Sequence, residues 1–318
     1  MILDTYEDSD NTEVLFSYLP AWEMFFSMHV LADWDHHMYR RRWAERIYGK
    51  EPKLVDRIAG LGEITDKWNF VIDAPWWGQI RQMEIGEMLS FLQKKNIYQW
   101  NEMIGYTGRK MDIAARDAVV RTLKEYYERI FEREERLLRP YLTRILKKEE
   151  ERCRKLGIWQ WCSGIHPRLL VEEDRIIYLK NREYCYEKSQ IRRIYVMVSS
   201  FVNPHLWMYK GEGELEMVKA VLVEQAQDGV PEKCVLVFKA LGDTTRLNIV
   251  KLLMQGTLTT QELAQKMGIS EAGVSRHLRV LNQAGLGSKS MKGHFVEYNF
   301  LTEMIDFIPY TFYETMML

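Results

Sequence analysis

The order of hydrophobic and polar positions changes twice along the chain, and each pattern predicts a different kind of element. From residue 13 to about 156 the pattern predicts helices, and after Gly108 the apolar residues recur in steps of three and four, which is typical of an amphipathic helix. From about 158 to 225, β-branched and aromatic runs such as Arg175–Lys180 and Arg193–Val198 predict strands. Helical spacing returns after Pro231. The sequence therefore predicts a mostly helical α+β protein with a small sheet before its C-terminal region.

Two apolar patterns stand out in the N-terminal region. The stretch Val14–Leu31 is apolar nearly all round, as expected of a buried helix. A long helix is expected after Gly108, and Pro140 should kink it or restart it as a first-turn proline. Its apolar stripe favours a core position, with dimerisation as the alternative. The stripe consists of Val119, Leu123, Tyr126, Ile130, Leu137, Tyr141 and Ile145.

A cluster of turn-forming residues, Gln227–Pro231, predicts the main domain boundary. We expect a first region over 1–227, with helices over about 13–156 and a small sheet over about 158–225. A second domain follows over 228–318. Pro231 fits the first turn of the helix that opens this domain.

Capping residues and apolar faces agree with one another throughout the second domain. A helix over Glu232–Leu241 should end at Gly242, and Asp243 should cap a second helix. Core residues of that second helix are expected to be Leu247, Ile249, Val250, Leu252 and Leu253. Thr259 or Thr260 should cap a short third helix that ends at Met267, and Ser270 a fourth. The fourth helix would bury Val274, Leu278 and Leu281.

Two alternating runs around Lys292-Gly293 predict a β-hairpin with a basic tip. A short helix, a tight turn, a second helix and such a hairpin make up a winged helix-turn-helix, which places the fourth helix in the DNA major groove. From Pro231 to Asn299 there are nine Lys/Arg and five Asp/Glu, an excess that suits phosphate binding. The candidate DNA-binding residues are Ser270, Glu271, Gly273, Ser275, Arg276, His277, Arg279, Lys289, Lys292 and His294.

Three segments of this domain resemble ArsR-type transcription regulators. They are Phe238–Val250 (FKALGDTTRLNIV), Glu262–Ser270 (ELAQKMGIS) and Val274–Leu286 (VSRHLRVLNQAGL), and the wing KGHFVEY continues the match. The resemblance covers roughly residues 231 to 300. It implies a homodimer on a partly palindromic double-stranded operator, usually repressing until an effector lowers its affinity. Residues 1–225 also resemble the undefined N-terminal segment of larger ArsR-like regulators of Gram-positive bacteria.

Several positions depart from the family pattern. Thr244 stands where proline is usual, Glu271 where a polar amide is common, and His294 where arginine is frequent. A carboxylate at 271 would accept a hydrogen bond only from a base amino group such as cytosine N4, so the operator sequence does not transfer. Thr257–Thr260 holds no cysteine and Met304–Tyr310 no histidine, so neither metal site of the family is expected, nor any cofactor.

Charge and composition add little about partners but bound the protein class. The formal net charge is −1, so attraction to nucleic acid must be local. No apolar run has the length of a membrane span, and the acidic N-terminus lacks the basic start of a secretory signal, which indicates a cytoplasmic protein without membrane contact. The four cysteines Cys153, Cys162, Cys185 and Cys234 are expected to be reduced.

Other functions stay open for the N-terminal region. His29, Asp33, Asp35, His36 and His37 have spacings that a metal site could use, although a polar helix end explains them equally well. The alternatives also include a thiol sensor, an aromatic-lined pocket for a small-molecule effector, and a protein-interaction or assembly module. An enzyme domain fused to a DNA reader is the remaining one. Gly60-Leu-Gly62 lacks the third glycine and preceding strand of a dinucleotide loop, so no enzyme is predicted.

Overall fold

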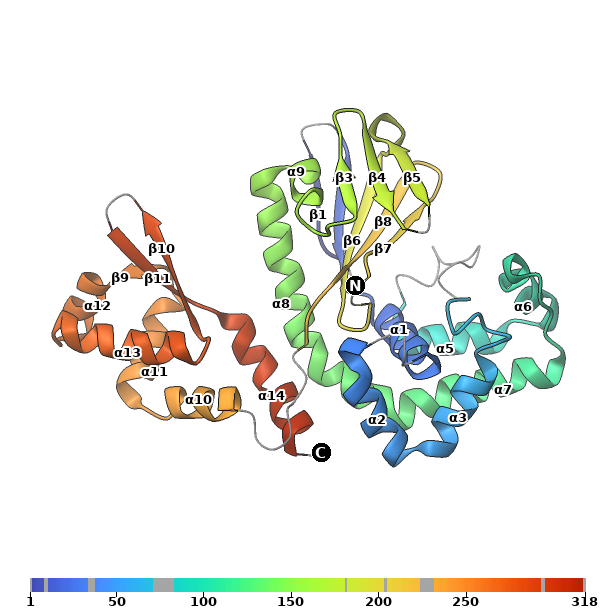
Figure 1. Ribbon diagram of the computed structural model, residues 1–318, viewed down its shortest axis with the longest axis horizontal. Helices are drawn as coiled ribbons and strands as arrows, with labels where there is room; N and C mark the ends of the chain where they lie inside the picture. Colours follow the sequence, from blue (N-terminus) through green and yellow to red (C-terminus); the bar gives the residue numbers. More distant parts are fainter. Residues whose placement is uncertain are drawn as a thin grey trace. The chain divides into compact units, whose positions relative to one another are not determined.

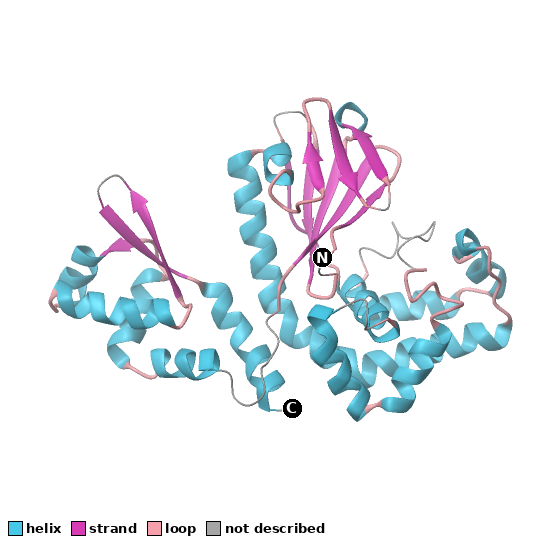
Figure 2. Cartoon of the chain, in the orientation of Figure 1, coloured by secondary structure: helices cyan, strands magenta, loops and turns pink. Residues whose placement is uncertain are grey.

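The computed structural model describes residues 2–8, 11–33, 38–70, 83–180, 182–202, 205–223, 232–292 and 295–316. The chain divides into two compact units, unit 1 over Met1–Gln225 and unit 2 over Ala226–Leu318. The boundary expected at residues 227 and 228 lies outside the described residues. Helices predominate and are joined by a five-stranded sheet and two three-stranded sheets, so the predicted α+β class is confirmed (Figure 1, Figure 2).

The five-stranded sheet forms the centre of unit 1. Its strand order is β1 (Ile2–Glu7), β2 (Glu13–Ser17), β6 (Arg193–Ser199), β8 (Glu214–Ala220) and β7 (Trp207–Lys210). The three middle strands run parallel and the two edge strands antiparallel. Figure 1 shows the N-terminal strands lying beside strands that come almost two hundred residues later.

An ion-pair ladder connects the three parallel strands where they begin. Arg193 of β6 lies opposite Glu13 of β2 and Glu214 of β8. Its guanidinium is 2.5 Å from a Glu13 oxygen and 3.0 Å from a Glu214 oxygen. Opposite charges on neighbouring strands favour this register over a slipped one.

The predicted helix over Val14–Leu31 is wrong in its first part. Residues 13–17 form β2, and the helix α1 begins only at Pro20 and ends at Ala32. Because a central parallel strand is buried on both faces, Val14, Leu15 and Phe16 form a continuous apolar run instead of alternating. Such a run cannot be distinguished from a buried helix by its period.

Several helices of unit 1 gather around α1, whereas α9 lies beside α8 and β3, as Figure 1 shows. α1 packs against α2, α3 and α5, and α7 packs against α3 and α5. Their bounds are α2 Arg41–Lys50, α3 Pro52–Leu61, α5 Ile85–Lys94, α6 Ile97–Met103, α7 Ile113–Tyr126, α8 Glu132–Leu156 and α9 Ile158–Cys162. Short 3₁₀ turns lie at Met38–Arg40, Gly105–Thr107 and Lys188–Gln190.

A π-helical turn over Tyr127–Phe131 interrupts the predicted long helix between α7 and α8. Up to Ile130 the expected stripe is buried. Beyond it Tyr141 is buried as expected, but Leu137 and Ile145 are only half buried, whereas their neighbours Leu138 and Leu146 are buried. A π turn holds an extra residue, so it rotates the buried face by one position. Pro140 lies within α8, which continues through it.

The expected small sheet over 158–225 is also corrected. Residues 158–162 are helical, and β6, β7 and β8 join the N-terminal strands in the central sheet. A separate antiparallel sheet contains β3 (Leu169–Val171), β4 (Arg175–Leu179) and β5 (Glu183–Glu187). The N-terminal strands carry no signal of their distant partners, which is why one small sheet was expected.

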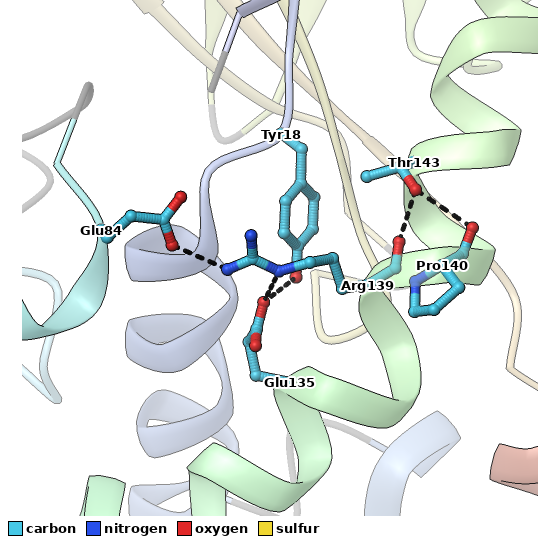
Figure 3. A network of polar contacts seen from close by, with 6 residues as sticks. All are labelled: Tyr18, Glu84, Glu135, Arg139, Pro140 and Thr143. Atoms are coloured by element: carbon cyan, nitrogen blue, oxygen red, sulfur yellow. Dashed lines mark hydrogen bonds and ion pairs between the residues drawn. The ribbon is translucent and has the colours of Figure 1, made fainter.

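A polar network ties α8 to the starts of two other helices of unit 1 (Figure 3). Arg139 donates to Glu84, the N-cap of α5, over 2.7 Å and also pairs with Glu135 of its own helix. The hydroxyl of Tyr18, just before α1, donates to Glu135 over 3.4 Å. Next to Pro140, which has no N–H, the Thr143 hydroxyl donates to the Arg139 carbonyl over 2.7 Å. The network connects α8 near Pro140 to α5 and to the start of α1.

Unit 2 folds as the predicted winged helix-turn-helix. Its elements are α10 Glu232–Leu241, α11 Thr244–Leu253, β9 Leu258–Thr259, α12 Thr260–Met267, α13 Glu271–Gln283, β10 Gly287–Lys292, β11 Phe295–Phe300 and α14 Thr302–Met316. The core includes Ile249, Leu263, Leu278 and Phe300. Leu247 was expected in this core but is 48% exposed, because it lies two residues, more than half a turn, from Ile249.

Candidate nucleic-acid interface

Local capping sets the ends of the helices that build the interface. The Asp243 side chain accepts from the Arg246 N–H over 2.9 Å, and Ser270 accepts from the Gly273 N–H over 3.1 Å. Thr259 and Glu262 cap each other reciprocally, and the hydrogen bond from the Thr259 backbone lowers the pKa of Glu262. All three predicted caps are confirmed, with Thr259 rather than Thr260 at the third helix.

The turn between α12 and α13 depends on one glycine. Gly268 has φ +66 and ends α12 in the left-handed region, which favours glycine. The chain then enters α13 at Ser270, so the two helices pack against each other over Leu263 and Val274. This arrangement presents the other side of α13 to solvent.

The solvent side of α13 carries most of the predicted DNA-binding residues. Glu271, Ser275, Arg276 and Arg279 are exposed, and Gly273 is half buried. The opposite side is buried through Val274, Leu278 and Leu281, as predicted. The helix therefore brings two guanidinium groups together on a face that a DNA groove can reach.

His277 is oriented differently from its neighbours. Its side chain is 26% exposed and its Nδ1 lies 3.9 Å from Asp243. Arg246 connects α11 to the end of α10, because its guanidinium donates to the carbonyls of Ala240 and Lys239 over 2.6 and 2.8 Å. Arg246 was predicted to be such an intradomain donor. The hydrogen bond from its N–H is the main cause of the lowered pKa of Asp243.

The predicted wing is formed by β10 and β11, which pair antiparallel (Figure 2). Lys289 lies opposite Tyr298 and is exposed, and the Lys292 side chain is 77% exposed with its Nζ 3.2 Å from Glu297. Gly293 and His294 lie outside the described residues. β9 adds a third strand by pairing with β11, which the sequence interpretation missed because it spans only two residues.

An open pocket lies between α13 and the wing. Its volume is about 410 Å³. Three of the residues that line it were predicted to contact DNA, namely Ser275, Arg279 and Lys289. The others, Asn282, Gln283 and Tyr298, were not predicted. Their spacing from Arg279 along the helix was a signal for the first two, but the approach of Tyr298 follows only from the hairpin register.

The other candidate sites of the sequence interpretation lie in unit 1. His29 Nδ1 is 2.7 Å from the Lys67 carbonyl and Asp33 pairs with Lys67, while residues 34–37 lie outside the described residues. Within the described ranges, no three His, Cys, Asp or Glu side chains are grouped so as to hold a metal ion. Nor does any helix there have the length and apolar character of a membrane span.

The cysteines are all free thiols. Cys153 is buried and accepts from the Tyr6 hydroxyl over 3.0 Å, and burial raises its pKa to about 11. Burial also raises the pKa of Cys162. Since the thiolate is the reactive form, these two buried cysteines are poorly suited to rapid oxidation. Cys185 is exposed.

Similarity to known proteins is concentrated in unit 2. A family model described as "Bacterial regulatory protein, arsR family" matches residues 243–288. The transcriptional repressor SdpR of Bacillus subtilis (strain 168) is 39% identical over 69 residues, which are 22% of this chain and 77% of that protein. A probable mercury resistance operon repressor of Streptomyces lividans is 33% identical over 69 residues, 22% of this chain and 55% of that protein.

A solved structure is similar over about a quarter of the chain. HlyU from Vibrio cholerae N16961 is 29% identical, covers 24% of this chain and 86% of its own, and has a TM-score of 0.22. The family assignment rests instead on the matched segment and the B. subtilis relative. The matched segment contains α11, α12 and α13, whose caps and exposed basic face were described above. The winged helix-turn-helix matches the family model, and the B. subtilis repressor is 39% identical over 77% of its own length. This chain therefore belongs to the arsR family of bacterial regulatory proteins.

Proposed function

We propose that the protein is a cytoplasmic, homodimeric repressor that binds a partly palindromic DNA operator through unit 2 and is modulated through unit 1. The observation that carries the proposal is the exposed side of α13, where Arg276 and Arg279 extend from a helix whose other side is buried. A helix presented this way fits the major groove, and the adjacent wing suits the backbone.

The contacts differ in the role we assign to them. Ser270, Glu271, Gly273, Ser275 and Arg276 belong to the first turns of α13, which approach base edges in helix-turn-helix proteins. Glu271 would accept from a cytosine amino group. Lys289, Lys292 and His294 of the wing, together with Arg279, would contact phosphates. His277 faces Asp243, so we assign it a contact at the edge of the interface.

Exposed aromatic residues on α10 and α14 support the homodimer. Phe238 is 46% exposed, Phe312 37% and Tyr313 45%, and the rings of Phe238 and Phe312 lie 5.8 Å apart in an edge contact. An apolar surface of this kind is typical of a protein contact. The same surface would serve a pure assembly module, which is the second candidate function.

Unit 1 is the proposed regulatory part. The two relatives described above match 22% of this chain each, so a unit as large as residues 1–225 is available for a separate task. We propose that it receives an unidentified small molecule or a protein partner and changes the operator affinity of unit 2. We assign it no catalytic step, metal or cofactor.

Selection of bound duplexes from a random library tests the function directly. The wild type should enrich a roughly palindromic site, and Arg276→Ala should weaken binding to that site by about 1–3 kcal/mol while relaxing the preference at one base position. Lys292→Ala should weaken binding to all duplexes about equally. Binding should also fall steeply with salt, because phosphate contacts release counterions.

The opposite result is equally clear. If the wild type enriches no sequence and binds every duplex no more tightly than arbitrary DNA at physiological salt, the regulator proposal is wrong in this form. A dimer that persists under those conditions would then favour the assembly module. A uniform loss with Arg276→Ala would instead assign that arginine to phosphate.

A further inference from the structure

The pocket between α13 and the wing has the shape of a site for a small charged group. Arg279, Asn282 and Gln283 follow Ser275 by four, seven and eight residues along α13. This spacing places all four on one side of the helix. Lys289 and Tyr298 form the facing wall, as directly opposed residues of β10 and β11. The volume of about 410 Å³ is ample for one phosphodiester group and its waters.

The charges around this pocket lack a partner. Among the described residues, neither Arg279 nor Lys289 forms an ion pair, and the six side chains that line the pocket include no carboxylate. Lys292, three residues further along β10, pairs with Glu297 instead. Two cations on facing walls attract an anion between them.

The neutral side chains of the pocket complete a set of hydrogen-bond donors. The Asn282 carbonyl oxygen is buried without a partner in the described structure. That oxygen lies beside Gly287, where a Cβ would clash with it, so the glycine leaves room for the Asn282 amide at the pocket wall. The Ser275 and Tyr298 hydroxyls and the Gln283 amide add further donors. Guanidinium, ammonium and neutral donors together recognise phosphate oxygens.

We propose that this pocket holds one phosphate of the DNA backbone and thereby fixes how deeply α13 enters the groove. The inference rests on the proposed function and adds Asn282, Gln283 and Tyr298 to the interface. The source is the DNA backbone, because Arg279 and Ser275 belong also to the exposed side of α13. A phosphate beside the groove meets the pocket when the helix is inserted. The contact positions the protein without reading a base.

Salt dependence of operator binding measures the contact. The full chain is titrated with the selected operator at several salt concentrations, as wild type, Arg279→Gln, Lys289→Gln and the control Lys251→Gln. Lys251 is exposed on α11 and outside the pocket, so its substitution changes net charge equally. Each pocket variant should lower the slope of log Kd against log salt by about 1.8, which is about 0.9 for the phosphate of each half-site, and should weaken binding by about tenfold at physiological salt. The loss should be the same on a mismatched duplex.

Neutral phosphates locate the contact on the DNA. Operators carrying a single methylphosphonate are scanned along the backbone. At one position in each half-site, the wild type should lose about tenfold in affinity, whereas the Arg279→Gln/Lys289→Gln double variant should lose nothing further. Asn282→Asp, which adds a negative charge to the pocket, should weaken binding to every duplex.

Two results would overturn the inference. In the first, the slopes of log Kd against log salt for Arg279→Gln and Lys289→Gln equal the slope for Lys251→Gln, and every methylphosphonate position affects the wild type and the double variant alike. In the second, inorganic phosphate without DNA stabilises the wild type but not the double variant, and the salt slope of DNA binding is unchanged in the variants. This result would assign the pocket to a free anion. In both cases operator binding by the wild type persists, so the proposed function stands. A wild type that binds no operator overturns both.

Discussion

At the scale of single residues, Glu23 is a buried carboxyl group of unit 1. It lies on α1, is 1% exposed, and accepts hydrogen bonds from the backbone N–H and hydroxyl of Ser200 over 2.8 and 2.6 Å. Burial raises the pKa of Glu23, while the hydrogen bonds from Ser199 and Ser200 act in the opposite direction. The carboxyl joins the end of β6 to the first turns of α1. Its ionised form is disfavoured in the folded protein.

Glu23 should make the stability of unit 1 depend on pH. Because its folded pKa lies above the ordinary value of 4.5, the folded state binds the proton more tightly, and the free energy of unfolding falls as pH rises from 4.5 through the folded pKa. Glu23→Gln removes this titration, so the Tm of the variant minus that of the wild type should increase with pH. All ten tryptophans lie in unit 1, so tryptophan fluorescence reports its unfolding.

A matched substitution controls for charge alone. Glu63 is exposed in the same unit, and Glu63→Gln should give a difference in Tm that stays flat with pH. If Glu23→Gln also gives a flat difference between pH 4 and 8, Glu23 is not the source of the pH dependence.

At the scale of elements, the helix-turn-helix is specified by short-range signals. Asp243, Thr259 and Ser270 each bond to a backbone N–H three residues later, so these helix starts depend on a few neighbouring residues. The π turn before α8 is the opposite case. Nothing in the local spacing marks it, and it rotates the buried face of the following helix.

Gly268 sets the turn between α12 and α13 by its backbone alone. An added Cβ would meet no atom within 4 Å, so the cost of Gly268→Ala comes from the left-handed φ and should be about 1 kcal/mol. Gly268→Asn should cost less, because asparagine tolerates this conformation. Calorimetry measures both effects as a lower Tm for the unfolding of unit 2. That transition is recognised because it does not change tryptophan fluorescence, since all tryptophans lie in unit 1.

The same substitution in an ordinary helix is the comparison. Gly49 of α2 has open space around it and no left-handed φ, so Gly49→Ala should stabilise unit 1 by up to about 1 kcal/mol. Equal Tm values for Gly268→Ala and Gly268→Asn would contradict the backbone explanation.

At the scale of the whole molecule, the proposed dimer links two DNA-reading helices. The wild type should have twice the 37.9 kDa mass of one chain by light scattering. Phe238→Glu places a charge on the exposed aromatic face of α10 and should return the mass to that of one chain. Operator affinity should fall about a hundredfold, because the second half-site is then bound independently.

Leu247→Glu provides the control for this prediction. Leu247 is as exposed as Phe238 but lies on α11, so its substitution adds the same charge to the same unit. The dimer proposal fails in its stated geometry if both variants keep the mass of two chains, or if both lose it together.

The sequence by itself determined unit 2 almost completely. Helix caps, glycine stops and the apolar face of α13 all act over a few residues, and every element of the helix-turn-helix lies within the seventy residues after Pro231. Of the residues expected on the solvent side of α13, Glu271, Ser275, Arg276 and Arg279 are exposed, whereas Gly273 is half buried. Which of them touch bases and which touch phosphates stays a prediction.

Only the tertiary structure decided the centre of unit 1 and the pocket of unit 2. β2 pairs with β6 across about 180 residues of intervening chain, and a strand buried on both faces has the same apolar run as a helix. Likewise, Asn282 and Tyr298 line one pocket because the hairpin register places Tyr298 opposite Lys289. Local spacing specifies an element and its buried face. Which distant elements then meet is decided by packing and hydrogen bonding between segments whose separation no local pattern records.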